Sequence, residues 1–427
     1  MMTTDAFGQV LTTDAETARV YDDATVAIMC MQQGTLDLLD RAIEQDPKFA
    51  LAHATKAALD FEMHDLIDSA EQYRAAVECL DRSATPREVA FVHAVGDRIH
   101  GDRSAYRTYV DAYPSDPIGL TLAMPTIAFS GAFEDPGHAW HRLDDLAPLH
   151  GDAWWFTGLR AYAKLELEER DVAIALAEQS LRDQPLGATA AHARTHLYYE
   201  CGDHAAGAAW LADWIEGAGH SAVHRAHFSW HVAMHDLGLG DTNAALARYD
   251  ADLNPRTLRG TRSLIDGVSL LWRLHLIDIE DRTDDISAIL EVAGKEVDEP
   301  TTAFTAMHSA LAYAASGDAD SVARIAQHCR QGDSVAMTEV VSGFADALVE
   351  YVNADFAASA QGLMQLLPRS EEIGASRVQC EVIEDTALAA LIQAGHLVAA
   401  QEMLDSRLDR REHARDRIMR QRISTSN

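Results

Sequence analysis

The chain has 427 residues, of which 48% are hydrophobic and 24% are charged. This is the composition of a folded globular protein and excludes a disordered chain. The formal net charge of −32 opposes binding to nucleic acid and to anionic membrane surfaces, because each phosphate contact would have to overcome the repulsion. We therefore expect neither nucleic acid nor a membrane among the partners.

The N-terminal segment, residues 1–14, carries no sign of a secretion signal. Its sequence, MMTTDAFGQVLTTD, has neither a basic start nor an apolar run. No other stretch approaches the roughly 20 apolar residues that a membrane helix needs. The five cysteines are scattered and form no C-x-x-C pair, which is typical of reduced thiols rather than of a disulfide framework. We expect a cytoplasmic protein.

From residue 15 onward, short turn signals recur between apolar, Ala-rich segments that have helical periodicity. These signals are ECGD at 200–203, LGLGD at 237–241, ASGDAD at 315–320, VNADF at 352–356 and QAGHL at 393–397. The step from Asp203 to Asp241 is 38 residues, and that from Asp318 to Asp355 is 37. Such spacing is close to that of tetratricopeptide repeats, which are helix–turn–helix units.

The predicted fold is therefore all-α: a tetratricopeptide-like, right-handed helical-repeat superhelix of about ten helix–turn–helix units. These units fill one domain, residues 15–410. The Arg-rich C-terminal tail, residues 411–427, is expected to form a solvated terminal helix that caps the array and frays at its end. A homo-oligomer of such arrays is a further expectation.

Several histidines fall on the first helix of their predicted unit. Two pairs have a four-residue spacing, which puts both imidazoles on one helix face, namely His192 with His196 and His227 with His231. Asp266 and His308 lie on the first helices of later units. Because the first helices line the concave face of a tetratricopeptide array, these six side chains could converge on one groove. The alternative is that they are packing residues, as we interpret His235 beside the turn.

Two chemistries suit such a site. Neutral imidazoles with a pKa near 6.5 serve as general acids and bases, with His196 and His231 transferring protons and Asp266 orienting them. Alternatively, the four paired histidines could bind a divalent metal such as zinc, iron or manganese, with Asp266 or His308 as further ligands. The pattern lacks the Glu of H-E-x-x-H, so a metalloprotease is not indicated. The cofactor is thus either none or a divalent metal such as zinc.

The segments HARTH, HFSWHVAMHDLGLGD, SLIDGVSLLWRL and FTAMHSALAYAASGD follow one another along the chain. In order and spacing they resemble the tetratricopeptide repeat protein 38 family, and the resemblance extends over roughly residues 10–405. It implies an all-α tetratricopeptide-like superhelix and names no reaction, so function has to be argued from the site.

The same resemblance adds residues to the candidate site. It implies an early histidine at His53, and family positions at Trp230, Arg273 and Gln379. The sequence departs from the family pattern at Cys380 and Glu381, where the family has Arg and Asp.

The sequence predicts a His-lined concave pocket for a small polar or anionic molecule, in a protein that could be an enzyme. Arg273 would bind an anionic group, Trp230 would form an apolar wall, and His53 and Gln379 would complete the ligand-binding set. One alternative is a scaffold that binds a peptide or protein partner along the concave face. Peptide-clamping repeats usually present Lys, Arg and Asn, whereas these helices present His, Asp and aromatic residues. A third alternative is a structural subunit with a homodimer interface.

Overall fold

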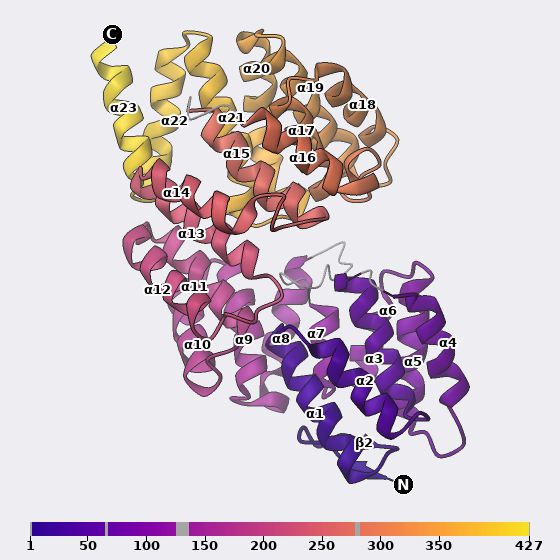
Figure 1. Cartoon of the computed structure of the whole chain (residues 1–427). Coiled ribbons are helices and arrows are strands. Elements are labelled where there is room, and N and C mark those ends of the chain that lie inside the picture. Colours follow the sequence, from indigo (N-terminus) through magenta and orange to yellow (C-terminus); the bar gives the residue numbers. More distant parts are fainter. Residues whose placement is uncertain (1, 65–66, 125–135, 278–281, 427) are drawn as a thin grey trace. The chain divides into compact units, whose positions relative to one another are not determined.

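The structure, a computed structural model, describes residues 2–64, 67–124, 136–277 and 282–426 (Figure 1). Within these ranges the chain is helical apart from loops and one hairpin of two short strands, so the predicted all-α class is confirmed. Parts of the expected array lie outside the described residues, namely 65–66, 125–135 and 278–281. None of the described helices combines the length and the apolar character needed to cross a membrane.

Contacts within the chain divide it into two compact units, and the single domain expected over residues 15–410 stays a prediction. Unit 1 comprises Met1–Leu197 and Trp214–Arg225, and unit 2 comprises Tyr198–Asp213 and Ala226–Asn427. The boundary divides the helices α11 (Ala188–Glu200) and α12 (His204–Glu216), and it separates Arg225 from the rest of the helix α13 (Arg225–Leu239).

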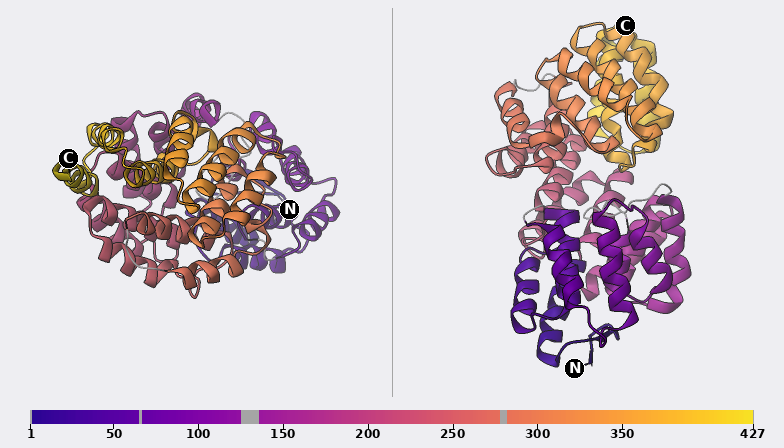
Figure 2. Two further views of the ribbon diagram at one scale, coloured as in Figure 1. Left: turned by 90° about the horizontal axis from the view of Figure 1, so that it is seen from above. Right: turned by 90° about the vertical axis from the view of Figure 1, so that its right-hand side faces the viewer.

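Unit 1 begins with the hairpin and continues as antiparallel helical pairs (Figure 2). Its elements are β1 (Thr3–Thr4), β2 (Val10–Leu11), α1 (Ala15–Met29), α2 (Thr35–Gln45), α3 (Ala50–Leu59), α4 (Ser69–Cys79), α5 (Pro86–Ile99), α6 (Ala105–Ala112), α7 (Pro117–Ala123), α8 (Pro136–His150), α9 (Trp154–Glu166) and α10 (Arg170–Asp183). The first helices of neighbouring pairs touch, as α3 and α5 do. The N-terminal segment is fixed to α5, because Thr12 donates hydrogen bonds to the Glu88 carboxylate and Arg87 donates to the Val10 carbonyl.

Unit 2 also consists of helical pairs, and its late helix α21 packs against the earlier helix α15. Its elements are α13 (Arg225–Leu239), α14 (Thr242–Arg248), the π-helical turn η3 (Ser263–Gly267), α15 (Val268–His275), α16 (Thr283–Val292), α17 (Ala303–Ala315), α18 (Ala319–Cys329), α19 (Ser342–Val352), α20 (Phe356–Leu366), α21 (Arg377–Gln393), α22 (Leu397–Arg410) and α23 (Ala414–Ser426). Helix α15 packs beside α17, and α17 beside α19. Helix α21 then contacts α15, where Trp272 Nε1 donates to Thr386 Oγ1 at 2.9 Å. The helices of unit 2 therefore share one buried core.

The five turn signals mark helix boundaries where the sequence predicts them. At each turn one residue has a positive φ of 61–78°, namely Gly202, Gly240, Gly317, Ala354 and Gly395. The N–H of the next residue donates to the carbonyl five positions back, at 2.9–3.0 Å, which satisfies a carbonyl that the helix end would leave unpaired. In three turns the following Asp then caps the next helix by accepting from its backbone, namely Asp241, Asp318 and Asp355. The G-D signal therefore ends one helix and starts the next.

Candidate functional site

The α13 histidine pair lies in the interior of unit 2. His227 and His231 are 2% and 1% exposed, because α13 is buried on almost all of its faces. Their Nε2 atoms are 3.1 Å apart and their rings are nearly perpendicular. The indole of Trp230 stacks on His227, with centroids 5.4 Å apart and planes 12° apart. The four-residue spacing thus produces the juxtaposition that the sequence predicts for this pair.

The α11 pair has nearly the same geometry within unit 1. His192 and His196 are 4% and 3% exposed, and their Nε2 atoms are 3.0 Å apart. The phenol of Tyr162, from α9, stacks on His192 with centroids 5.4 Å apart and planes 12° apart. Each pair therefore consists of two perpendicular imidazoles with an aromatic ring stacked on the first one. Whether the six predicted side chains converge on one groove stays a prediction, because the two pairs belong to different units.

Asp266 is the polar partner of the α13 pair. It lies in η3, is 1% exposed, and its Oδ1 is 2.8 Å from His227 Nδ1. Its other oxygen, Oδ2, forms an ion pair with Arg262 Nη1 at 3.8 Å. A carboxylate accepts hydrogen bonds, so His227 carries its hydrogen on Nδ1 and presents the Nε2 lone pair to His231. Sequence reasoning named Asp266 as the residue that would orient a histidine, and it contacts His227.

Burial and charge set the protonation states of these groups. Desolvation lowers the pKa of His227, and the attraction of Asp266 offsets this shift only in part. Desolvation favours a raised pKa for Asp266, but its interaction with His227 and the charge of Arg262 hold the pKa below its usual value. Near neutral pH, His227 is therefore a neutral imidazole and Asp266 an ionised carboxylate.

His308 lies in α17 of the same unit. It is 1% exposed, and its Nδ1 donates to the Phe304 carbonyl at 2.8 Å, so the lone pair is on Nε2. Desolvation lowers its pKa to about 4, and the charge of Asp266 opposes this shift. His308 is therefore a neutral, buried imidazole that interacts electrostatically with the Asp266 carboxylate.

Arg273 and Trp230, the predicted ligand-binding residues of unit 2, have different surroundings. All three nitrogens of the Arg273 guanidinium donate to protein groups, which are Asp385 Oδ2, Ser269, and the carbonyls of Val378 and Gln379. The structure therefore assigns Arg273 to holding α15 against α21. The indole Nε1 of Trp230, in contrast, is buried with no hydrogen-bond partner among the described residues, whereas most buried donors in proteins are paired.

The two remaining predicted ligand-binding residues have local structural roles. Gln379 accepts hydrogen bonds from the Ser376 N–H and hydroxyl, which forms the capping box of α21. His53, in unit 1, lies between the Pro47 carbonyl and the Gln72 amide, at 3.2 and 2.6 Å. These contacts account for both side chains without a ligand.

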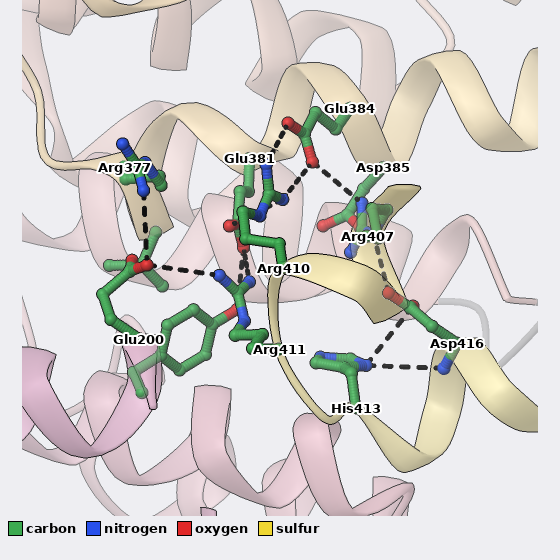
Figure 3. Close-up of polar contacts among 12 residues, drawn as sticks. Glu200, Arg377, Glu381, Glu384, Asp385, Arg407, Arg410, Arg411, His413 and Asp416 are labelled. Atoms are coloured by element: carbon green, nitrogen blue, oxygen red, sulfur yellow. Dashed lines mark hydrogen bonds and ion pairs between the residues drawn. The ribbon is translucent and has the colours of Figure 1, made fainter. Parts of the chain in front are cut away.

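The Arg-rich tail is largely buried where it begins, so our expectation of a solvated terminal helix is wrong for that part. Arg411 is 6% exposed and Asp416 is 1% exposed. Figure 3 shows arginines of α22 and the tail facing the Glu381 and Asp385 carboxylates of α21. Desolvation favours a raised pKa for Glu381, but Arg411, Arg407 and Arg410 together outweigh it and lower the pKa to about 2. A charged segment can be buried here because its arginines pair with acidic residues of α21 that lie 22 to 30 positions upstream.

A second histidine cluster, which sequence reasoning missed, fixes the same tail within unit 2. His204 Nδ1 is 3.2 Å from His235 Nδ1, and His204 Nε2 is 3.1 Å from the Glu412 carbonyl. The ring of His413 lies edge-on to His204 at 5.3 Å. Our interpretation of His235 as a structural residue agrees with these contacts. Nothing in the local sequence signals them, because the partners lie up to 209 positions apart.

The arrangement around Asp266 can bind and move a proton, and its imidazoles can bind a metal. His192, His196 and His231 each offer a buried ring nitrogen of the kind that ligates metal ions. The sequence matches no known protein-family model, so the resemblance to the tetratricopeptide repeat protein 38 family remains a prediction.

Proposed function

We propose that this protein is a cytoplasmic, tetratricopeptide-like helical-repeat protein, similar to the tetratricopeptide repeat protein 38 family, that binds a small polar molecule at the α13 histidines. The observation that carries the proposal is the buried hydrogen-bonded series Asp266–His227–His231. A charged carboxylate and two imidazoles in a protein interior are costly to desolvate, which is why such groups concentrate at functional sites.

The series determines which atom can accept a proton. Asp266 holds the His227 hydrogen on Nδ1, so His227 Nε2 accepts a hydrogen bond from the Nε2–H of His231. His231 then carries its lone pair on Nδ1 and is the base. When Nδ1 takes up a proton, the positive charge on His231 strengthens its hydrogen bond to His227, and the Asp266 carboxylate stabilises that charge.

Trp230 supports a polar ligand rather than a purely structural cluster. Its indole stacks on His227, and its buried Nε1–H has no partner in the part of the chain that the structure describes. A ligand oxygen that accepted from this N–H would lie beside both imidazoles and would satisfy the donor. Arg273, whose guanidinium lies over the same indole at 5.9 Å, supplies positive charge nearby while its own hydrogen bonds remain internal.

The competing function, a scaffold that binds a peptide, requires accessible side chains on a groove. The paired histidines are at most 4% exposed, which favours an enclosed small molecule over an extended peptide. If a panel of small polar and anionic compounds gave no ligand, the scaffold would become the better explanation.

Thermal-shift screening tests the proposal, because a ligand that binds only the folded state raises the melting temperature by mass action. We expect at least one compound class to stabilise the wild-type protein. His231→Gln should abolish that shift, Asp266→Asn should reduce it, and His396→Gln, at an exposed position of the same unit, should leave it unchanged. A shift that persisted in both site variants would contradict the proposal.

A further inference from the structure

The two histidine pairs have nearly the same distance between their Nε2 atoms and the same perpendicular arrangement of their rings, and a hydrogen bond alone does not require this match. Their Nε2–Nε2 distances are 3.0 and 3.1 Å, and their rings are 84° and 83° apart. Zinc–imidazole bonds measure about 2.0–2.1 Å. If an ion lay at that distance from both Nε2 atoms of a pair, the N–metal–N angle would be roughly 95°, which lies between the ligand angles of octahedral and tetrahedral coordination. From these coincident geometries we infer that the pairs are chelating sites for a divalent transition metal, zinc by preference.

The environment of His227 is the second observation in favour of a metal. A metal-ligating imidazole commonly donates its other N–H to a carboxylate, which fixes the tautomer and raises the basicity of the ligating nitrogen. His227 Nδ1 lies 2.8 Å from Asp266 Oδ1, so its lone pair is on Nε2, the atom that faces His231. The buried carboxylate also supplies negative charge close to the ion, which lowers the cost of burying a cation.

The choice of metal follows from the ligands. Neutral imidazole nitrogens suit zinc, copper, iron and nickel, whereas magnesium and calcium prefer oxygen ligands. Each pair supplies two ligands, so further positions on the ion are open to water or to a small polar molecule. Zinc has no redox activity and its coordination number is flexible, so it fits a site with two histidine ligands and further ligands that exchange.

This inference rests on the proposed function, since it concerns the α13 site, and it changes one role there. When His231 Nε2 is a metal ligand, its hydrogen lies on Nδ1, and a water bound to the ion would lose a proton and, as hydroxide, would replace His231 as the proton acceptor. The metal-free protein keeps the hydrogen-bonded series described above. Failure to bind metal therefore leaves the proposed proton acceptor intact, whereas loss of ligand binding by both forms removes the proposed function.

The test uses the full chain, purified without an affinity tag and stripped with EDTA. After addition of Zn²⁺ and removal of the excess, elemental analysis should find stoichiometric zinc. Two ions per chain would mean that each pair binds its own, and one would mean that only one pair is occupied. Titration with Co²⁺ should give the visible absorption of a low-symmetry, nitrogen-ligated cobalt.

Variants separate metal binding from packing. Asp266→Asn preserves the side-chain shape and should weaken zinc binding by roughly 10–100-fold, the usual effect of losing such a carboxylate. His231→Gln should remove stoichiometric zinc at the α13 pair. His235→Gln is the matched control, since His235 is equally buried on the same helix but outside the pair, and it should keep zinc. Absence of stoichiometric zinc in the wild type, or unchanged affinity in both site variants, would overturn the inference.

Discussion

At the scale of single residues, burial decides the chemistry of the histidines. Their four-residue spacing is visible in the sequence, and it brings His227 and His231 together in α13. Their carboxylate partner, Asp266, lies in the η3 turn, 39 positions after His227 in the sequence. Arg273 shows the opposite outcome, because Asp385 and two carbonyls of α21 occupy its donors. The family resemblance and the residue type suggested a ligand-binding arginine, and tertiary neighbours made it a structural one.

His308 should make stability depend on pH between about 6.5 and 4. Burial lowers its pKa from 6.5 to about 4. Between these two pH values His308 is protonated in the unfolded chain and neutral in the folded one. Its contribution to the free energy of unfolding is therefore fully present above pH 6.5 and is lost as the pH falls toward 4. The difference corresponds to roughly 3 kcal/mol over that window. His308→Gln should flatten the curve of unfolding free energy against pH, measured with urea from pH 7.5 to 4.5.

At pH 7.5 the difference in unfolding free energy between this variant and the wild type gives the cost of the lost packing and hydrogen bond. The pH effect is then read from the slopes of the two curves of unfolding free energy against pH. An unchanged slope in His308→Gln would show that this imidazole is not the group that titrates.

At the scale of elements, the turns have a common backbone design and different neighbours. Gly202 and Gly317 both have φ near 75° and end a helix in the same way. A Cβ at Gly317 would meet nothing within 4 Å, whereas a Cβ at Gly202 would lie 2.9 Å from the Glu412 nitrogen. The C-terminal tail of unit 2 therefore packs directly on the α11–α12 turn. The sequence shows the glycine signal in both turns and cannot show which one is covered.

Alanine at these two positions separates backbone strain from packing. Gly317→Ala should cost about 1–2 kcal/mol, the penalty of a left-handed conformation for a residue with a Cβ. Gly202→Ala carries the same penalty and also pushes against the Glu412 backbone, so it should cost roughly 1–3 kcal/mol more. Urea unfolding of the two variants measures the difference, and equal losses would show that the tail does not cover the Gly202 turn.

At the scale of the whole chain, the excess of acidic residues dominates. The chain has 67 acidic and 35 basic residues, and two of its arginines, Arg407 and Arg411, are buried in the network of Figure 3. The unpaired negative charge is therefore left largely on the surface, where like charges repel and destabilise the folded state. Salt screens surface charges, since the Debye length falls from about 10 Å at 0.1 M to about 3 Å at 1 M.

We expect the melting temperature to rise by a few degrees between low salt and 1 M KCl. Calorimetry or circular dichroism measures it, and sucrose at equal osmolality is the control for effects of an excluded solute. A melting temperature that fell with KCl would mean that surface ion pairs, rather than surface repulsion, dominate the electrostatic energy.

The sequence by itself determined the helical class, the positions of the five turns and the pairing of the histidines. These features are local: helical periodicity, the positive φ that favours glycine, and the four-residue repeat of a helix face act over a few residues. Tertiary structure decided the grouping into two units, the burial of the tail and the partners of Asp266, Arg273 and Glu381. Those outcomes depend on contacts between residues 22 to 211 positions apart, and no periodicity along the chain encodes which helices will meet.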